Sequence, residues 1–170
     1  VDVQTADFGQ LNTYFVRADM TSLKQTLIAR LFRPDVVLHD PGEAGTLRRA
    51  AAEIGIQAIT VVAGGPHRFQ QDVVFPVRSG LLDMLVHLEM QDGEIDSTGD
   101  SPVDCHIAYW LYTEQSGILE VYPDVGDDVK HGTEIGRLTN VFGDIISEYT
   151  APENGIVLSK SVNPVSQAGG

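Results

Sequence analysis

Two unbroken apolar stretches, each followed by a turn and separated by a helical pattern, constrain the fold of this chain most strongly. They lie in residues 34–40 (PDVVLHD) and 57–67 (QAITVVAGGPH), and helical patterns occupy residues 21–32 and 45–56. Strands that are apolar on both faces, rather than on alternate residues, are typical of parallel sheets covered by helices. The sequence therefore predicts an α/β fold with a mostly parallel sheet and flanking helices.

The predicted helices have recognisable ends and apolar faces. Residues 21–32 begin with Thr-Ser and precede Pro34, and residues 45–56 end near Gly55 with Ala and Leu directed inward. A third helix is predicted over residues 79–90. The expected apolar face of the first helix consists of four side chains: Leu23, Leu27, Ile28 and Leu31.

The pattern changes in the second half of the chain. Residues 91–105 lack periodicity and are rich in Gly, Ser, Asp and Pro, which indicates a linker or a long excursion. Residues 106–170 contain short strands in two related halves around a central hairpin, which is typical of a small all-β barrel-sandwich domain. Lipoyl and biotinyl domains carry a lysine at that hairpin turn, whereas residues 142–144 are Phe-Gly-Asp, so no carrier role is expected. The predicted domain boundaries are 1–90, 91–105 and 106–170.

Composition places the chain among ordinary globular proteins. With 170 residues, 42% of them apolar, it can bury a real core. No apolar run approaches the roughly 18 residues of a membrane span, and the first residues lack the profile of a signal peptide, so a cytoplasmic location is expected. The single cysteine, Cys105, excludes an internal disulfide and a multi-cysteine zinc site.

The net charge of −13 is unevenly distributed along the chain. Residues 1–88 hold 8 Lys and Arg against 9 Asp and Glu, whereas residues 89–170 hold 3 against 15. This asymmetry indicates two units with different surfaces. Such an acidic surface repels phosphate groups and argues against nucleic acid or an anionic membrane as a partner.

In sheets of the predicted kind, ligands bind at the carboxyl ends of the strands. The residues concerned are 4–7, 39–42 and 62–67. The first strand ends at Gln4, in the sequence VDVQT, and a side chain at this place points into a crevice. A glutamine carbonyl oxygen can reach a metal ion, but it is a poorer zinc donor than imidazole and suits harder ions.

Three stretches of the sequence carry a resemblance to a known family. They are VDVQTADFGQLNTYFVRADM, GTLRRAAAEIGIQAITVVAGGPHRFQ and GILEVYPDVGDDVKHGTEIGRL, together with FGD and APENG. In this order and spacing, across nearly all 170 residues, the chain resembles the succinylglutamate desuccinylase/aspartoacylase family of zinc-dependent hydrolases. The resemblance implies a zinc-carboxypeptidase-like α/β domain, present in part, with an added β domain. It also implies a small-molecule substrate, an N-acyl amino acid or related amide, and leaves a homo-oligomer open.

The resemblance implies a zinc ion held by two His and one Glu, with a second Glu as general base. This sequence departs from that pattern. Gln4 stands where the family's D-x-H-T strand has its ligand histidine, and Val62 stands where the family's T-V-E has its general base. The family's first ligand pair, an H-x-x-E before that strand, is expected to be missing. Taken alone, the chain should bind catalytic zinc weakly and hydrolyse amides slowly.

Two histidines are candidates near these positions. His39 ends a predicted strand and could replace a metal ligand beside Gln4, or it could be an ordinary hydrogen-bonded histidine. His67 follows the Gly-Gly-Pro turn near Val62 and could supply a base, or it could be a loop histidine. The residues themselves leave both alternatives open.

Three further residues match the family's substrate-binding pattern. Arg48 matches an arginine that holds the substrate carboxylate, with a helix-capping or salt-bridging role as the alternative. Asn12 and Arg17, in LNTYFVRAD, also belong to the pattern, with loop hydrogen bonding and packing as the alternative. Two functions follow: a catalytically impaired acyl-amino-acid amidohydrolase, or a non-catalytic ligand-binding or scaffold protein derived from that family.

Overall fold

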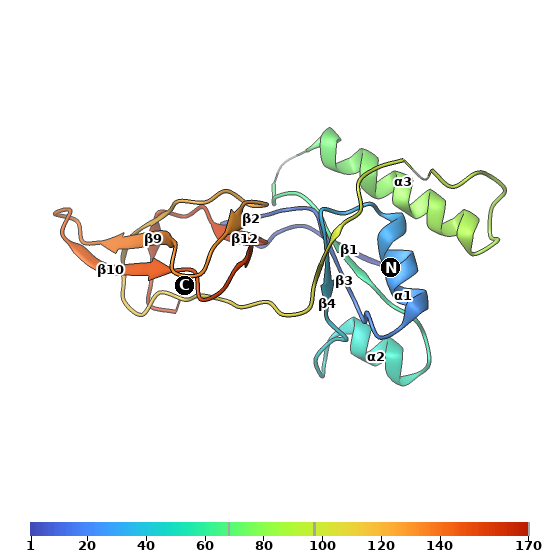
Figure 1. Cartoon of the computed structure of the whole chain (residues 1–170), viewed down its shortest axis with the longest axis horizontal. Helices are drawn as coiled ribbons and strands as arrows, with labels where there is room; N and C mark the ends of the chain where they lie inside the picture. Colours follow the sequence, from blue (N-terminus) through green and yellow to red (C-terminus); the bar gives the residue numbers. More distant parts are fainter. Residues whose placement is uncertain (68, 97, 170) are drawn as a thin grey trace. The chain divides into compact units, whose positions relative to one another are not determined.

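The chain forms two compact units, which are described separately (Figure 1). The first, here called the α/β unit, consists of Val1–Thr5 and Tyr14–Ala108, and the second, the β unit, consists of Ala6–Thr13 and Tyr109–Gly170. Residues 6–13, which the sequence assigns to the α/β domain, thus belong to the β unit. The computed structural model describes these parts of the chain: residues 1–67, 69–96 and 98–169.

A five-stranded mixed sheet forms the centre of the α/β unit. Its strands, in spatial order, are β1 (Asp2–Gln4), β5 (Thr60–Val62), β3 (Phe15–Ala18), β4 (Val36–His39) and β6 (Val103–Cys105). Three neighbouring pairs are parallel, and β3 and β5 are antiparallel. The prediction of a mostly parallel sheet is therefore corrected to a mixed one, because β5 enters between β1 and β3 and runs against β3.

The register of this sheet brings residues from distant parts of the sequence side by side. Two rows cross β1, β5, β3 and β4 in that order: Asp2, Thr60, Arg17 and Leu38, and then Gln4, Val62, Phe15 and Val36. Since β5 and β3 are antiparallel, the carboxyl ends of β1 and β5 lie at one end of the sheet, and those of β3 and β4 lie at the other. The residues expected at one ligand-binding end are thereby divided between two.

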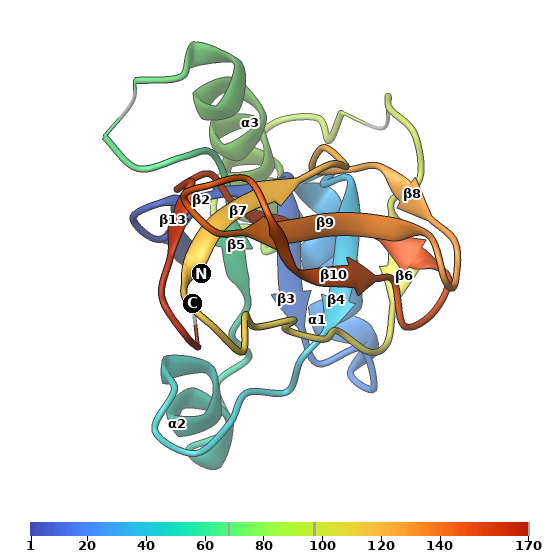
Figure 2. The ribbon, with the colours of Figure 1, turned by 90° about the vertical axis from the view of Figure 1, so that its left-hand side faces the viewer.

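The main core lies on one face of the sheet, against helices α1 (Leu23–Leu31) and α3 (Gln71–His87). Figure 2 shows α1 behind β3 and β4. The sheet contributes alternate, fully buried side chains of β3, β4 and β5, and α1 contributes the turn before Phe32. The buried core residues are Val16, Ala18, Ile28, Ala29, Phe32, Val37, Ile59 and Val61.

The buried face of α1 differs from the predicted one. Leu23 is 87% exposed and Leu27 is also exposed, whereas Gln25, Ile28 and Ala29 are buried. Gln25 can be buried because its Oε1 accepts a hydrogen bond from the Asp19 backbone N–H at 3.1 Å. Because a buried glutamine does not appear in a pattern of apolar residues, the sequence prediction placed the buried face of the helix on Leu23 and Leu27 instead.

The other two helices also differ from their predictions. Helix α3 begins at Gln71, upstream of the predicted 79, and includes Pro76. Its apolar stripe begins at Val77, which packs on the core together with Leu81 and Met84. Helix α2 (Leu47–Glu53) buries only Arg48, and its leucine is exposed rather than directed inward. A polar contact, not apolar packing, therefore fixes α2.

Antiparallel pairs make up the β unit. Its four-stranded sheet has the order β10 (Ile145–Thr150), β9 (Glu134–Thr139), β7 (Gly117–Val121) and β13 (Val165–Ser166). Two short ladders join β11 (Gly155–Ile156) to β8 (Asp128–Val129) and β12 (Ser159–Ser161) to β2 (Gln10–Asn12). The unit is all-β, as predicted, while its barrel-sandwich arrangement stays a prediction.

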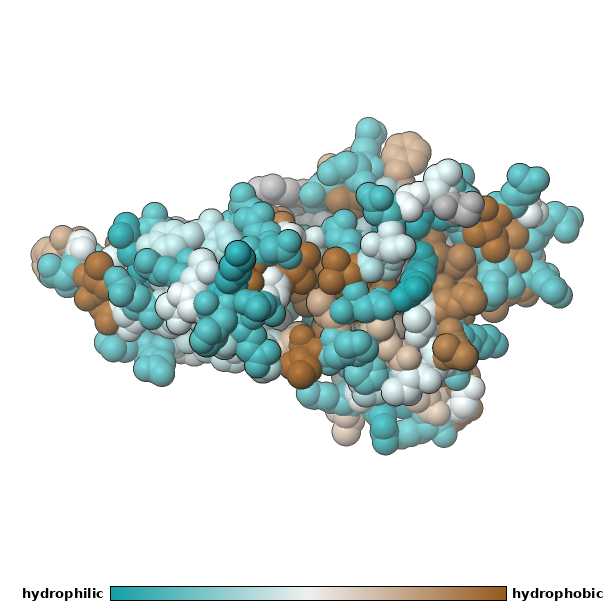
Figure 3. Space-filling view, in the orientation of Figure 1, coloured by the Kyte–Doolittle hydropathy of each residue, from teal (hydrophilic) through white to brown (hydrophobic). Residues whose placement is uncertain are grey.

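The predicted central hairpin is the β9–β10 pair. Its turn carries an exposed apolar tip, with Phe142 88% exposed next to an exposed Val141. Apolar atoms gather at the end of this hairpin in Figure 3.

In the α/β unit, β6 pairs with β4 from within residues 91–105, the predicted linker or excursion. No helix among the described residues has the length and apolar character needed to cross a membrane.

Replacing Gly80 of α3 by alanine tests the close contact of α1 with α3. A Cβ at Gly80 would lie 2.7 Å from the Phe32 Cα and 2.6 Å from its ring. Because backbone cannot yield as a side chain can, we expect Gly80→Ala to lower the free energy of unfolding by about 1–2 kcal/mol, despite the better helix propensity of alanine. Urea unfolding followed by far-UV circular dichroism measures the change.

Gly155→Ala is the matched control, because a Cβ there meets nothing within 4 Å. We expect it to change the free energy by less than about 0.5 kcal/mol. Equal stabilities for Gly80→Ala and the wild type would contradict the described contact.

Candidate functional site

The candidate site lies on the face of the α/β sheet opposite to the core. Side chains two residues apart on a strand share a face, so Asp2 and Gln4 of β1 lie on one face. The register adds Thr60 of β5 and Arg17 of β3 to the same face. The side chains of Asp2, Gln4, Thr60 and Arg17 cross three strands on this face and are called the polar row. Asp40 and Arg48 contact it.

One hydrogen-bonded chain links α2 to β1 on this face. Arg48 Nη1 donates to Thr60 Oγ1 at 2.6 Å, and Thr60 Oγ1 donates to Asp2 Oδ2 at 3.3 Å. Gln4 Nε2 donates to the same Asp2 oxygen at 2.6 Å. The side chain of Gln4 is thus connected to the buried guanidinium of Arg48 through two intermediate groups.

Asp40, directly after β4, holds two guanidinium groups. Its Oδ2 accepts from Arg48 Nη2 at 2.6 Å and from Arg17 Nη1 at 3.3 Å, and its Oδ1 accepts from the Gly42 N–H at 2.8 Å. Burial by itself raises the pKa of Asp40, but the Gly42 amide and the charges of Arg48 and Arg17 together lower it below its ordinary value. The carboxylate is therefore charged at neutral pH. Gly42 has φ 87°, a turn that favours glycine.

The two arginines differ in accessibility. The Arg48 side chain is only 10% exposed, and its Nε has no hydrogen-bond partner among the described residues. The Arg17 side chain is 34% exposed and lies over the Phe15 ring, with 5.5 Å from its Cζ to the ring centroid. Arg48 therefore anchors α2 to the sheet, and Arg17 offers the more accessible cation.

Gln4 and Val62, the two positions where the sequence departs from the family that it resembles, are neighbours. They pair in register on β1 and β5, and the Ala63 N–H donates to the Gln4 carbonyl at 2.9 Å just beyond them. Val62 is 4% exposed and has no group that can accept a proton. The structure thus brings these two predicted positions together.

His39 lies far from Gln4. Three strand spacings separate β4 from β1, about 14 Å, and His39 is three residues, about 10 Å, beyond the row that contains Gln4. Zinc ligands lie about 2 Å from the ion, so these two side chains cannot share one. Moreover, His39 Nδ1 accepts from the Met20 N–H at 3.0 Å, which leaves the ring proton of the neutral form on Nε2.

Two predicted residues are placed without a described role. His67 is exposed on the loop after β5, at the same end of the sheet as Gln4, with φ 55°. Asn12 belongs to β2 of the β unit, where its Oδ1 is buried and has no partner among the described residues. Their functional roles stay predictions.

One H-x-x-E spacing does occur in the sequence, but it lies far downstream of the first strand. It joins His131 to Glu134 at the start of β9 in the β unit, where His131 Nδ1 lies 2.6 Å from the Pro152 carbonyl oxygen. Within residues 1–67, 69–96 and 98–169, no three His, Cys, Asp or Glu side chains are grouped so that they could hold a metal. The amide of Gln4, tied to Asp2, and the aliphatic Val62 do not fit a catalytic zinc ion.

Two residues of the network, Asp2 and Thr60, were missed at the level of sequence, and Asp40 lies within residues 39–42, which were expected at a ligand-binding end, but was given no role of its own. Each is polar and lies within or directly after a predicted strand, which is the only signal they give. Their contacts depend on the order of β1, β5 and β3 across the sheet. Periodicity does not encode that order.

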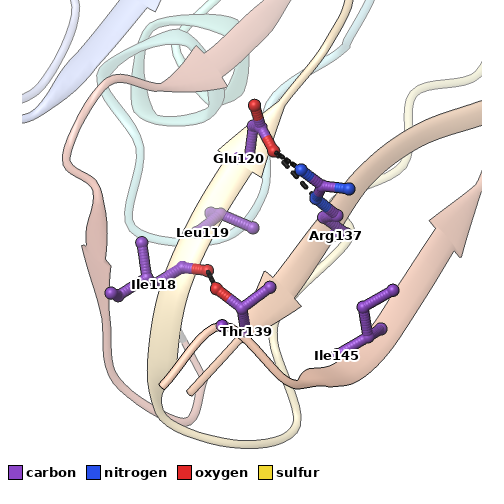
Figure 4. A pocket seen from close by; sticks show the side chains of 7 residues that line it. Ile118, Leu119, Glu120, Arg137, Thr139 and Ile145 are labelled. Atoms are coloured by element: carbon purple, nitrogen blue, oxygen red, sulfur yellow. Dashed lines mark hydrogen bonds and ion pairs between the residues drawn. The ribbon is translucent and has the colours of Figure 1, made fainter. Parts of the chain in front are cut away.

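The β unit has a cavity of its own, of about 500 Å³, on the β7–β9 face (Figure 4). The ion pair of Arg137 with Glu120, at 2.8 Å, lies on one side of it, and Ile118 and Ile145 line the other. None of the predicted site residues lines this cavity.

Comparisons with known proteins identify the fold. No protein-family model matches the chain, and no curated protein does. Among solved structures, the apo ectoine utilization protein EutE (DoeB) from Ruegeria pomeroyi has a TM-score of 0.86 at 21% identity, over 99% of this chain and 56% of that one. The chain has the fold of this protein.

Two further structures carry the name of the family that the motifs resemble. The succinylglutamate desuccinylase from Silicibacter sp. TM1040 has a TM-score of 0.80 at 22% identity, over 100% of this chain and 55% of that one. The succinylglutamate desuccinylase/aspartoacylase from Rhodobacter sphaeroides has a TM-score of 0.82 at 20% identity, over 99% and 54%. The resemblance is therefore confirmed at the level of the fold, and this chain spans little more than half of each structure's length.

Replacing Asp40 by asparagine tests the two-arginine cluster. The substitution keeps the shape of the side chain but leaves the buried Arg48 without its counter-charge. We expect Asp40→Asn to lower the free energy of unfolding at pH 7 by about 2 kcal/mol. Glu53→Gln, which breaks the exposed pair with Arg49 at 3.1 Å, is the matched control and should cost less than about 0.5 kcal/mol.

The effect of Asp40→Asn should depend on pH in one direction. Because the pKa of Asp40 is lowered in the folded protein, its contribution is complete above the unfolded carboxyl pKa of about 3.9 and is lost as the pH falls below that. Urea unfolding of both proteins between neutral and acidic pH should show their difference shrinking below about pH 4. A difference that is constant with pH would show that the charge of Asp40 does not stabilise the fold.

Proposed function

We propose that this chain is a catalytically impaired member of the succinylglutamate desuccinylase/aspartoacylase family that still binds a small N-acyl amino acid or related amide. The observation that carries the proposal is the pairing of Gln4 with Val62 in adjacent strands, on the same face as the Arg17–Asp40–Arg48 cluster. The names and fold of the similar structures support the family and the ligand class.

The chemistry of the two substituted positions supports the loss of hydrolysis. Amide hydrolysis in this family would need a metal-activated water and a carboxylate that moves its proton to the leaving amine. An alkyl side chain at Val62 cannot accept that proton, and Gln4 does not supply an imidazole ligand. The residues of this chain therefore provide no base at the position where the reaction needs it.

The arginine cluster supports retained binding. Arg17 is partly exposed, and its guanidinium forms an ion pair with Asp40, which also pairs with Arg48. A guanidinium fixed in this way can pair with a ligand carboxylate through charge-assisted hydrogen bonds. We assign carboxylate binding to Arg17 and the support of that site to Arg48.

Titration calorimetry with N-acetyl-L-aspartate and N-succinyl-L-glutamate tests this proposal. We expect at least one of them to bind, and Arg17→Gln to weaken binding by about tenfold or more, because one charge-assisted hydrogen bond contributes about 1.5–3 kcal/mol. Arg49→Gln, on the exposed side of α2, is the matched control and should leave affinity unchanged.

Product release and zinc content should be measured on the same samples. We expect no liberated amine above the uncatalysed rate. Turnover with stoichiometric zinc would overturn the impairment. A wild-type protein that binds neither compound would overturn the ligand-binding function and favour the scaffold alternative.

A further inference from the structure

We propose that Gln4 is a hydrogen-bond acceptor that recognises the N–H of the ligand, so that the site selects an amide or ammonium nitrogen rather than a carbonyl oxygen. This inference rests on the proposed function, because it concerns the ligand bound beside Arg17. It starts from the mismatch between Gln4 and a zinc site: the side chain that replaces the expected imidazole is held in a defined orientation of its own.

The hydrogen-bond directions along the polar row are fixed by the chemistry of its members. A guanidinium only donates and a carboxylate only accepts. Arg48 must therefore donate to Thr60, and the Thr60 hydroxyl donates a hydrogen bond to Asp2. The remaining contact of Asp2, at 2.6 Å, must come from the NH₂ group of Gln4. The Asp2 carboxylate thus fixes which way the Gln4 amide is turned.

This orientation decides what Gln4 presents to a ligand. With its nitrogen bound to Asp2, its Oε1 points away from Asp2 and can only accept a hydrogen bond. The Gln4 side chain is exposed, whereas its neighbour Val62 is buried and apolar. A ligand group at this place meets one exposed acceptor oxygen, so an N–H is attracted and a carbonyl oxygen is repelled.

Asp2 strengthens the preference. A charged acceptor polarises the amide that donates to it, and this makes the oxygen of the same amide a better acceptor. The negative charge of Asp2 also favours a ligand nitrogen with a partial or full positive charge. Asp2 is therefore a positioning residue: it orients Gln4.

The distance to Arg17 suits an amino-acid derivative. Arg17 lies two strands from Gln4 and two residues along, which places their Cα atoms about 12 Å apart. Both side chains are long and cover much of that span. A ligand whose N–H lies a few bonds from a carboxylate can meet Gln4 with the first and Arg17 with the second.

Two probes that differ in a single group test the inference: N-acetyl-L-aspartate and O-acetyl-L-malate, in which an ester oxygen replaces the amide N–H. We expect the wild type to bind the amide roughly tenfold more tightly than the ester, because the ester places an acceptor against Gln4 Oε1. Titration calorimetry of the whole chain measures both affinities.

Three variants accompany the measurement. Gln4→Met keeps the length of the side chain but removes the strong acceptor, and should bring the amide-to-ester ratio to about one. Asp2→Asn frees the Gln4 amide to turn over, and should lower the ratio as well. Gln115→Met, at an exposed glutamine of the β unit, is the matched control and should keep the wild-type ratio.

The outcomes separate this inference from the proposed function. Equal binding of amide and ester by the wild type, or an unchanged ratio in Gln4→Met, overturns the role of Gln4 while Arg17-dependent binding stands. Failure of the wild type to bind either of these compounds overturns the inference, and failure to bind N-succinyl-L-glutamate as well overturns the proposed function. Circular dichroism that matches the wild type shows that a variant is folded, and the Asp2→Asn ratio provides a second test through a different residue.

Discussion

The ion pairs of the Asp40 carboxylate with Arg17 and Arg48 are the interactions on which the polar side of the α/β unit depends. It joins Arg17 of the sheet to Arg48 of α2 through one shared oxygen. Because α2 buries no side chain except Arg48, this ion pair and the contact of Arg48 with Thr60 replace the apolar packing that holds α1. A charged cluster thus has two consequences: it positions a helix, and it keeps one guanidinium accessible beside the site.

The direction of β5 decides at which end of the sheet each candidate site residue lies. Since β5 is parallel to β1 and antiparallel to β3, Gln4 and Val62 lie at one end of the sheet, while His39 and Asp40 lie at the other. Arg17 and Thr60 share a row with Asp2, and this row lies toward the end that carries Asp40. The polar network follows this row and reaches the other end only through Gln4, so a ligand on it would meet different chemistry at each end.

Sequence reasoning found the elements more readily than their relations. The strands around residues 36–38 and 60–62 and all three helices could be predicted, because apolar runs, caps and stops are local signals. Strand direction could not, since an apolar run reads the same whether its neighbour is parallel or antiparallel. For that reason a position of His39 beside Gln4 stayed open as one alternative, and Asp2 and Thr60 were not considered at all. Arg48 was found through its motif, but its burial follows from Asp40, which the motif does not include.

Gln4 and Val62, which pair in adjacent strands, are physically coupled. A glutamate at Val62 would be a carboxylate in a position that is 4% exposed, and it would lie beside Gln4, which offers no positive charge. An unpaired buried charge is strongly unfavourable unless a cation compensates it. With a metal ion at the Gln4 position, such a carboxylate has a partner; without one, a valine that packs is the better residue. Beside Gln4, an apolar side chain at position 62 therefore packs without needing a counter-charge.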